Sequence, residues 1–170
     1  TIVCTTGMLG DLVQNMVKDK YHVITLMGPG VDPHLYKATQ GDLKSLSDAE
    51  IIVYNGLHLE GKMGEIFEKL ENRKHIIVAA KAIPDSDLIN NTDFQGAYDP
   101  HLWFDVKLWS KVAEYIGNEL ANLDEENKKE LRSNIESYLS KLEILHQETI
   151  ENLNQLDSSK RVLILSLIHI

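Results

Sequence analysis

Cysteine is almost absent from this sequence, in which Cys4 is the only one. A single thiol excludes an intrachain disulfide and a zinc site built from several thiolates. The neighbours of Cys4 are apolar or β-branched, which predicts a small buried strand residue without redox chemistry. The sequence also lacks any apolar run near the roughly 20 residues that a membrane-spanning helix needs. These absences argue against a disulfide-rich scaffold and against a transmembrane helix.

Basic residues are scarce, with 17 Lys and Arg against 26 Asp and Glu and a formal net charge of −9. Nucleic acids and anionic membranes bind clustered Lys and Arg, so this balance argues against both partners. Three common catalytic signatures are missing as well: Gly-x-x-x-x-Gly-Lys, Gly-x-Ser-x-Gly and His-Glu-x-x-His. The 170 residues suffice for one well-packed domain, or for one lobe and part of another.

Apolar, β-branched runs alternate with helical patterns along the first eighty residues. Because these runs are continuously apolar, they favour an α/β fold with a parallel sheet flanked by helices on both faces. Ligands of such sheets bind on the loops at the carboxyl ends of the strands, here residues 28–39, 55–61 and 80–103. Strands are predicted at Thr1–Thr5, Tyr21–Met27, Glu50–Tyr54 and His75–Ala79, and helices at Met8–Val17, Gln40–Ser47 and Lys62–Leu70.

Two helices are predicted in the second half of the chain. Asp105 is the expected N-cap of a helix that runs to Leu120. Residues 124–156 contain no Gly or Pro, and their apolar residues recur at steps of three and four. This pattern predicts one amphipathic helix about 45 Å long. A coiled coil is the alternative, but Thr149 interrupts the apolar seam, so we expect the helix to lie across its own domain.

We expect the chain to have three parts. Residues 1–123 form an α/β lobe, and residues 124–157 form the long linking helix. Residues 158–170 begin a further lobe with a strand at Arg161–Leu165, which has too few neighbours to be buried. The chain starts without Met, which leaves room for a signal segment ahead of Thr1.

The tetrapeptide Asp-Pro-His-Leu occurs twice, at Asp32–Leu35 and Asp99–Leu102. Proline restricts its own backbone and that of the preceding residue, so each His is held on a stiff loop. Neutral imidazole is the commonest protein ligand for transition metals. His34 and His101 are therefore the candidate metal ligands. Each preceding Asp either orients its imidazole through the second ring nitrogen or only caps its own turn.

The other histidines are weaker candidates. His58 follows a predicted strand and lies on a loop that lines the same edge of the sheet. His22 and His75 open strands at the opposite edge and are predicted to be structural, and His146 is predicted to face solvent from the long helix. The sequence gives no basis for judging His169.

Four runs of this sequence resemble the TroA-like solute-binding proteins, the zinc and manganese receptors of bacterial ABC importers. The similarity extends from Thr1 to about Ser166, and the four motifs occur in the family's order. The runs are Thr5–Asp11 (TTGMLGD), Gly28–Tyr36 (GPGVDPHLY), Tyr54–Glu60 (YNGLHLE) and Asp99–Val106 (DPHLWFDV).

The resemblance implies two α/β lobes joined by one long helix, with the metal held between them. His34 and His101 match the two ligands of the first lobe. The third ligand, a His or Glu, is expected after the strand Arg161–Leu165, where this chain has Leu167, and the fourth lies beyond Ile170. The run 166–170 does not resemble the family, so we interpret it as a truncated or foreign end; the alternative is a variant that uses His169.

The function implied by the resemblance is capture of a divalent Zn or Mn ion, without enzymatic activity, for delivery to an ABC permease. Such a receptor is periplasmic or anchored to the outer face of the cytoplasmic membrane, and we expect a monomer. A metal-dependent hydrolase, with Asp99 or Asp105 helping the two histidines to activate water, is one alternative. The other is an adhesion or interaction module that uses the acidic long helix as its contact surface.

Overall fold

The computed structural model describes residues 1–90 and 97–161. A four-stranded sheet forms its centre, in the order β2-β1-β3-β4, and every pair of neighbouring strands is parallel. The prediction of an α/β fold with a parallel sheet is confirmed. The four strands predicted in the first eighty residues are all present within two residues of their expected bounds: β1 (Ile2–Thr6), β2 (Val23–Met27), β3 (Ile51–Tyr54) and β4 (His75–Val78).

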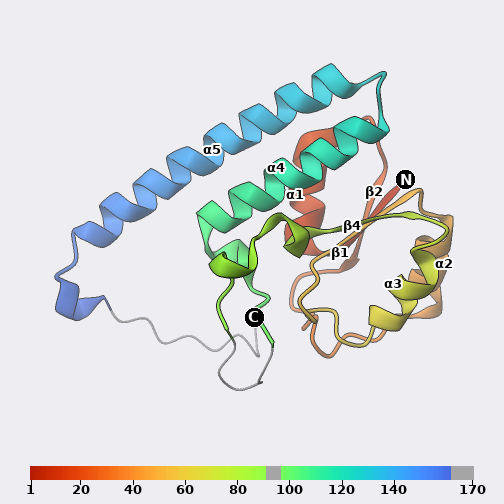
Figure 1. Ribbon diagram of the computed structural model, residues 1–170, viewed down its shortest axis with the longest axis horizontal. Coiled ribbons are helices and arrows are strands. Elements are labelled where there is room, and N and C mark those ends of the chain that lie inside the picture. The colour runs from red at the N-terminus through yellow and green to blue at the C-terminus, as the bar shows by residue number, and fades with distance from the viewer. Residues whose placement is uncertain (91–96, 162–170) are drawn as a thin grey trace.

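Helices cover both faces of the sheet (Figure 1). One face carries α2 (Gln40–Asp48) and α3 (Gly64–Leu70), and the other carries α1 (Gly7–Val17), α4 (Val106–Leu123) and α5 (Lys128–Asn154). Successive residues of a strand point to opposite faces. Val3 and Ile52 therefore belong to the core under α2 and α3, whereas Ile2, Cys4 and Val53 belong to the core under α1 and α4. Burial on both sides explains why these strands are apolar without alternation.

Cys4 lies in the larger core and is fully buried. Burial raises the pKa of its thiol to about 12. Since the thiolate is the reactive form, this residue is an inert core side chain, as its neighbours predicted.

The connection from β4 to α4 is not without structure. Its described residues, 79–90 and 97–105, include three short 3-10 helices, η1 (Ala79–Ala82), η2 (Asp85–Asp87) and η3 (Leu102–Phe104). The Asp105 carboxylate then accepts hydrogen bonds from the backbone nitrogens of Lys107 (2.8 Å) and Leu108 (3.2 Å). Asp105 is thus the N-cap of α4, as predicted, and the helix continues to Leu123, three residues past its expected end.

The long helix α5 begins at Lys128 rather than at Asp124. The carboxylate of Asp124 instead accepts hydrogen bonds from Tyr21 and from Asn127, which fixes the turn between α4 and α5. The N-terminal part of α5 packs on α4 and α1, so the helix does lie across its own domain there. Helix α4 allows a close approach because a Cβ at Gly117 would lie 2.5 Å from the Ile135 side chain.

The predicted apolar seam of α5 is buried over only part of its length. Leu131, Ile135 and Leu142 are buried, whereas Leu145 and Leu153 are 48% and 49% exposed. Figure 1 shows the C-terminal part of α5 running past the start of α4, where it has no helix beneath it. The periodicity predicted the helix correctly, and the contacts decide how much of its apolar face is covered.

A further short 3-10 helix, η4 (Ser158–Lys160), follows α5. The predicted strand over 161–165 lies outside the described residues except for Arg161. The run 166–170, with Leu167 and His169, lies outside them entirely. Within residues 1–90 and 97–161, no helix is both long and apolar enough to cross a bilayer.

Candidate metal site

The first histidine stands on the loop between β2 and α2. Asp32 Oδ1 accepts a hydrogen bond of 2.9 Å from the backbone nitrogen of His34, which closes the turn around Pro33. The far end of the loop is fixed by a capping box, in which Thr39 and Asp42 exchange hydrogen bonds at the start of α2. The Tyr36 hydroxyl donates to the same Asp42 carboxylate. The exposed side chain of His34 is therefore carried on a loop that is held at both ends.

The second histidine stands on the segment between β4 and α4 and repeats this turn. Asp99 Oδ1 accepts a hydrogen bond of 2.9 Å from the backbone nitrogen of His101. The same oxygen lies 2.6 Å from the ring atom Nδ1 of His101. A carboxylate only accepts, so Nδ1 donates its proton to Asp99, and in the neutral ring the lone pair is then on Nε2.

The two aspartates therefore differ in what they bind. Asp32 caps its turn, with no contact to the His34 ring among the hydrogen bonds of the described residues, whereas Asp99 caps its turn and also orients the ring of His101. Metal-binding imidazoles are commonly fixed in this way through the nitrogen that does not bind the ion.

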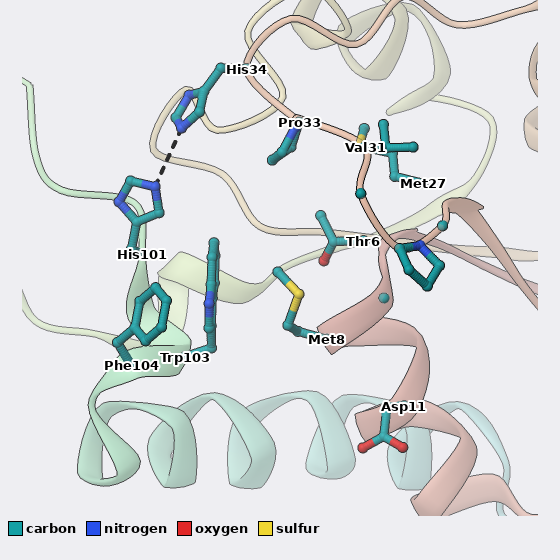
Figure 2. A pocket seen from close by; sticks show the side chains of 14 residues that line it. Thr6, Met8, Asp11, Met27, Val31, Pro33, His34, His101, Trp103 and Phe104 are labelled. Atoms are coloured by element: carbon teal, nitrogen blue, oxygen red, sulfur yellow. Dashed lines mark hydrogen bonds between the residues drawn. The ribbon is translucent and has the colours of Figure 1, made fainter. Parts of the chain in front are cut away.

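The tertiary structure brings the two histidines together from loops 67 residues apart in sequence. Their Nε2 atoms are 3.4 Å apart, and their rings are inclined at 61° (Figure 2). Zinc binds imidazole nitrogen at about 2.0–2.1 Å, so two nitrogens of a tetrahedral ion are about 3.3–3.4 Å apart. The pair already has the separation that one shared ion requires.

The pair lies at one edge of a cavity of about 580 Å³ (Figure 2). Most of the lining is apolar, and it comes from the junction of β1 with α1, from the end of β2 and the loop that follows it, and from η3. The Trp103 ring lies edge-on to the His101 ring, with centroids 5.3 Å apart, and Phe104 is beside it. Trp103 thus packs against a candidate ligand, whereas Trp109 is buried in the core, as expected for a packing residue.

Two candidate ligands are all that the described part of the chain gathers at one point. Across residues 1–90 and 97–161, no group of three or more His, Cys, Asp or Glu side chains is placed to hold a metal. The two acidic residues of the hydrolase alternative already have hydrogen-bond partners, since Asp99 contacts the His101 ring and Asp105 caps α4. An ion bound to His34 and His101 therefore needs its remaining ligands from water or from residues outside this set.

The remaining described histidines do not join the pair. His58 is exposed on the loop after β3 and is absent from the lining of the cavity. His22 and His75 are exposed at the amino-terminal side of the sheet, and the backbone oxygen of His22 accepts a hydrogen bond from Ile2. His146 on α5 is half-buried, so the expectation of a solvent-facing side chain is only partly met.

A buried polar cluster behind the pair was not singled out by sequence reasoning. Glu60 is only 4% exposed and accepts hydrogen bonds from the Thr5 hydroxyl (2.7 Å) and from the backbone nitrogens of Asn55 (2.7 Å) and Gly56 (3.2 Å). Burial raises the pKa of Glu60, and these hydrogen bonds offset only part of that rise. The sequence signal was that Asn55, Gly56 and Glu60 fall within the motif Tyr54–Glu60, which the resemblance marked without giving these residues a role.

A solved structure shares this fold. The periplasmic zinc-binding protein TroA from Treponema pallidum superimposes with a TM-score of 0.91 and 40% identity, covering 95% of this chain and 58% of that one. The class is thereby defined as one α/β lobe of the TroA-like solute-binding fold with its long helix. The family model described as "Zinc-uptake complex component A periplasmic" (ZnuA) matches residues 2–167, and the chain belongs to this family.

Two curated relatives agree with this assignment. Zinc-binding protein TroA of Treponema pallidum is 39% identical over 163 residues, which is 96% of this chain and 52% of that protein. Manganese-binding lipoprotein MntA of Bacillus subtilis is 35% identical over 163 residues, or 96% and 53%. The chain spans about half the length of these relatives. The resemblance to TroA-like solute-binding proteins is confirmed.

Proposed function

We propose that this chain is the metal-capturing lobe of a receptor that binds a divalent Zn or Mn ion outside the cytoplasmic membrane and delivers it to an ABC permease. The single observation that carries the proposal is the 3.4 Å separation of His34 Nε2 and His101 Nε2. The relatives add to it, because they are named for zinc and manganese binding and one is a lipoprotein.

The same proposal assigns parts to the chain. Residues 1–123 are the lobe that carries the two histidines, residues 124–157 connect it to the rest of the receptor, and residues 158–170 begin the next lobe. The receptor acts as a monomer, either free in the periplasm or anchored by lipid. Its role involves no covalent chemistry, since the ion is cargo.

With only two imidazole ligands, the lobe is expected to bind a divalent ion weakly and with little selectivity among metals. The intrinsic preference then follows the Irving–Williams order, with Zn²⁺ above Mn²⁺. Selection of Mn²⁺ by a whole receptor would depend on further oxygen ligands, which manganese favours more than zinc does.

The test is calorimetric titration of the chain with Zn²⁺, using His34→Ala, His101→Ala and His58→Ala. His58 is exposed and outside the cavity lining, so its variant is the matched control. We expect binding to be lost or weakened about tenfold or more in the first two variants and unchanged in the third, because each loses one of two ligands. Unchanged binding in both His34→Ala and His101→Ala would refute the proposed site.

A further inference from the structure

The loop that follows β3, residues 55–61, lies between the two histidine-bearing segments. At its start, the Asn55 side-chain amide donates a hydrogen bond of 3.0 Å to the backbone oxygen of Pro100, the residue before His101. At its end, a Cβ built on Gly61 would lie 3.9 Å from the backbone oxygen of His34. The loop thus bonds to the residue before His101 and passes close to the backbone of His34.

Glu60 holds this loop closed. Its carboxylate accepts from the backbone nitrogens of Asn55 and Gly56, at the beginning of the loop, and from the Thr5 hydroxyl of β1. Gly56 has a φ of +86°, and a Cβ there would lie 2.8 Å from the Val78 side chain, so this tight start needs glycine. Glu60 and Asn55 are 4% and 1% exposed, and buried hydrogen bonds of this kind restrict a single conformation.

The contact at Pro100 bears directly on the position of His101. The Pro100 oxygen accepts from Asn55 Nδ2 and also from the backbone nitrogen of Leu102 at 2.9 Å. The proline ring fixes φ near −65°, so anchoring its carbonyl leaves the backbone of His101 little freedom. On the other side, Asp99 binds the backbone nitrogen and the ring of His101. Asp99 belongs to the same loop, whereas Asn55 ties that loop to the sheet.

We propose that Asn55, held in place by Glu60, is a positioning residue that sets the distance between His101 and His34. This inference rests on the metal site proposed above. Without the amide of Asn55, the turn at Asp99–His101 stays intact locally but is no longer fixed to the end of β3, and the 3.4 Å separation of the two Nε2 atoms is no longer imposed.

The experiment compares Asn55→Ala with Asn134→Ala. Asn134 is a matched control because its side-chain amide also donates to a backbone oxygen, that of Met16, at 2.8 Å across the α5–α1 contact. A second variant, Asn55→Leu, keeps a side chain of similar size but has no hydrogen-bond donor and places no charge at this buried position. It provides the same test if the alanine variant does not fold. Thermal unfolding of each variant is recorded first.

Two readouts separate positioning from general stability. Titration with Zn²⁺ is expected to show affinity reduced about tenfold in the Asn55 variants, as for loss of a residue that supports a metal ligand, and unchanged in Asn134→Ala. Without metal, long-range ¹H–¹⁵N spectra of the imidazoles are expected to show altered His101 signals in the Asn55 variants. Both histidines keep their signals in the Asn134 variant.

Wild-type Zn²⁺ affinity in a folded Asn55 variant, or unaltered His101 ring signals, would overturn the inference. A loss of affinity in Asn134→Ala as large as in Asn55→Ala would overturn it too, because stability alone would then explain both. Absence of Zn²⁺ binding by the unsubstituted chain would refute the proposed metal site instead. The metal-free ring signals would still decide whether Asn55 holds His101.

Discussion

The repeated Asp-Pro-His-Leu motif allows a prediction with a built-in control. Asp32 and Asp99 bind the backbone nitrogen of the histidine two residues later at the same distance, 2.9 Å. Only Asp99 also contacts a ring nitrogen, at 2.6 Å. Asp32→Ala and Asp99→Ala therefore lose the same turn bond, and only the second loses an imidazole partner. The ratio of their Zn²⁺ dissociation constants isolates the contribution of the ring contact.

The size of that ratio follows from the contact. A hydrogen bond to a charged group contributes about 1.5–3 kcal/mol. The Asp99 side chain is 42% exposed, so water screens the bond and the lower part of the range applies. A loss of about 1–2 kcal/mol corresponds to a Kd about five- to thirtyfold higher for Asp99→Ala than for Asp32→Ala. Asp99→Asn keeps an acceptor oxygen and is expected to recover part of the loss.

The assay is titration calorimetry with Zn²⁺ on the two alanine variants and Asp99→Asn. Circular dichroism of each variant establishes that the fold is intact. A ratio of the two alanine constants within about twofold of one, below 0.5 kcal/mol, would show that the ring contact adds nothing to the turn and would refute the reasoning.

Three further predictions concern stability. Gly117→Ala is expected to destabilise the wild-type chain by about 1–2 kcal/mol, because the added Cβ would press on Ile135. In an Ile135→Ala background the same substitution is expected to stabilise the chain by about 1 kcal/mol, because alanine favours a helix more than glycine does. Equal effects in both backgrounds, measured by urea unfolding, would contradict that contact. Asp42→Ala removes the capping box and should cost about 1 kcal/mol in urea unfolding. Burial raises the pKa of Asp42, but hydrogen bonds from Tyr36 and Thr39 outweigh burial and hold the pKa below 3.8. The stabilisation by the Asp42 carboxylate should therefore be present above pH 3.8 and be lost as the pH falls further. Burial and the hydrogen bond to Asp124 raise the pKa of Tyr21 from 10.0 to about 12. The free energy of unfolding should therefore fall as the pH rises from 10 to 12, because Tyr21 loses its proton in the unfolded chain first. Tyr21→Phe should make this loss of stability smaller, as measured by thermal melting at alkaline pH.

Much of the fold was predictable because its causes are local. Continuous apolar runs predicted all four strands of the sheet, and the side-chain oxygen of Asp105 predicted the start of α4. Helix periodicity predicted α5, but it did not predict how far the apolar face is covered. Leu142 is buried against the lobe and Leu153 is not, although both follow the same spacing. Coverage depends on where α4 begins beneath α5, which no local pattern contains.

By itself, the sequence determined two stiff loops with a histidine on each, because proline fixes the backbone wherever it stands. It also determined that both loops leave the carboxyl side of a parallel sheet. Only the tertiary structure decided that the rings meet. The histidine loops follow β2 and β4, the two outer strands in the order β2-β1-β3-β4, and they converge above the strands between them.

The structure also decided which aspartate touches a ring and that Asn55 and Glu60 are buried behind the pair. These outcomes depend on contacts between residues far apart in the chain, such as Asn55 and Pro100, which are separated by 45 positions. Residue types and local spacing identified His34 and His101 as candidates. The 3.4 Å between their Nε2 atoms comes from packing, because strand order and the buried hydrogen bonds behind the loops set how closely the two loops approach.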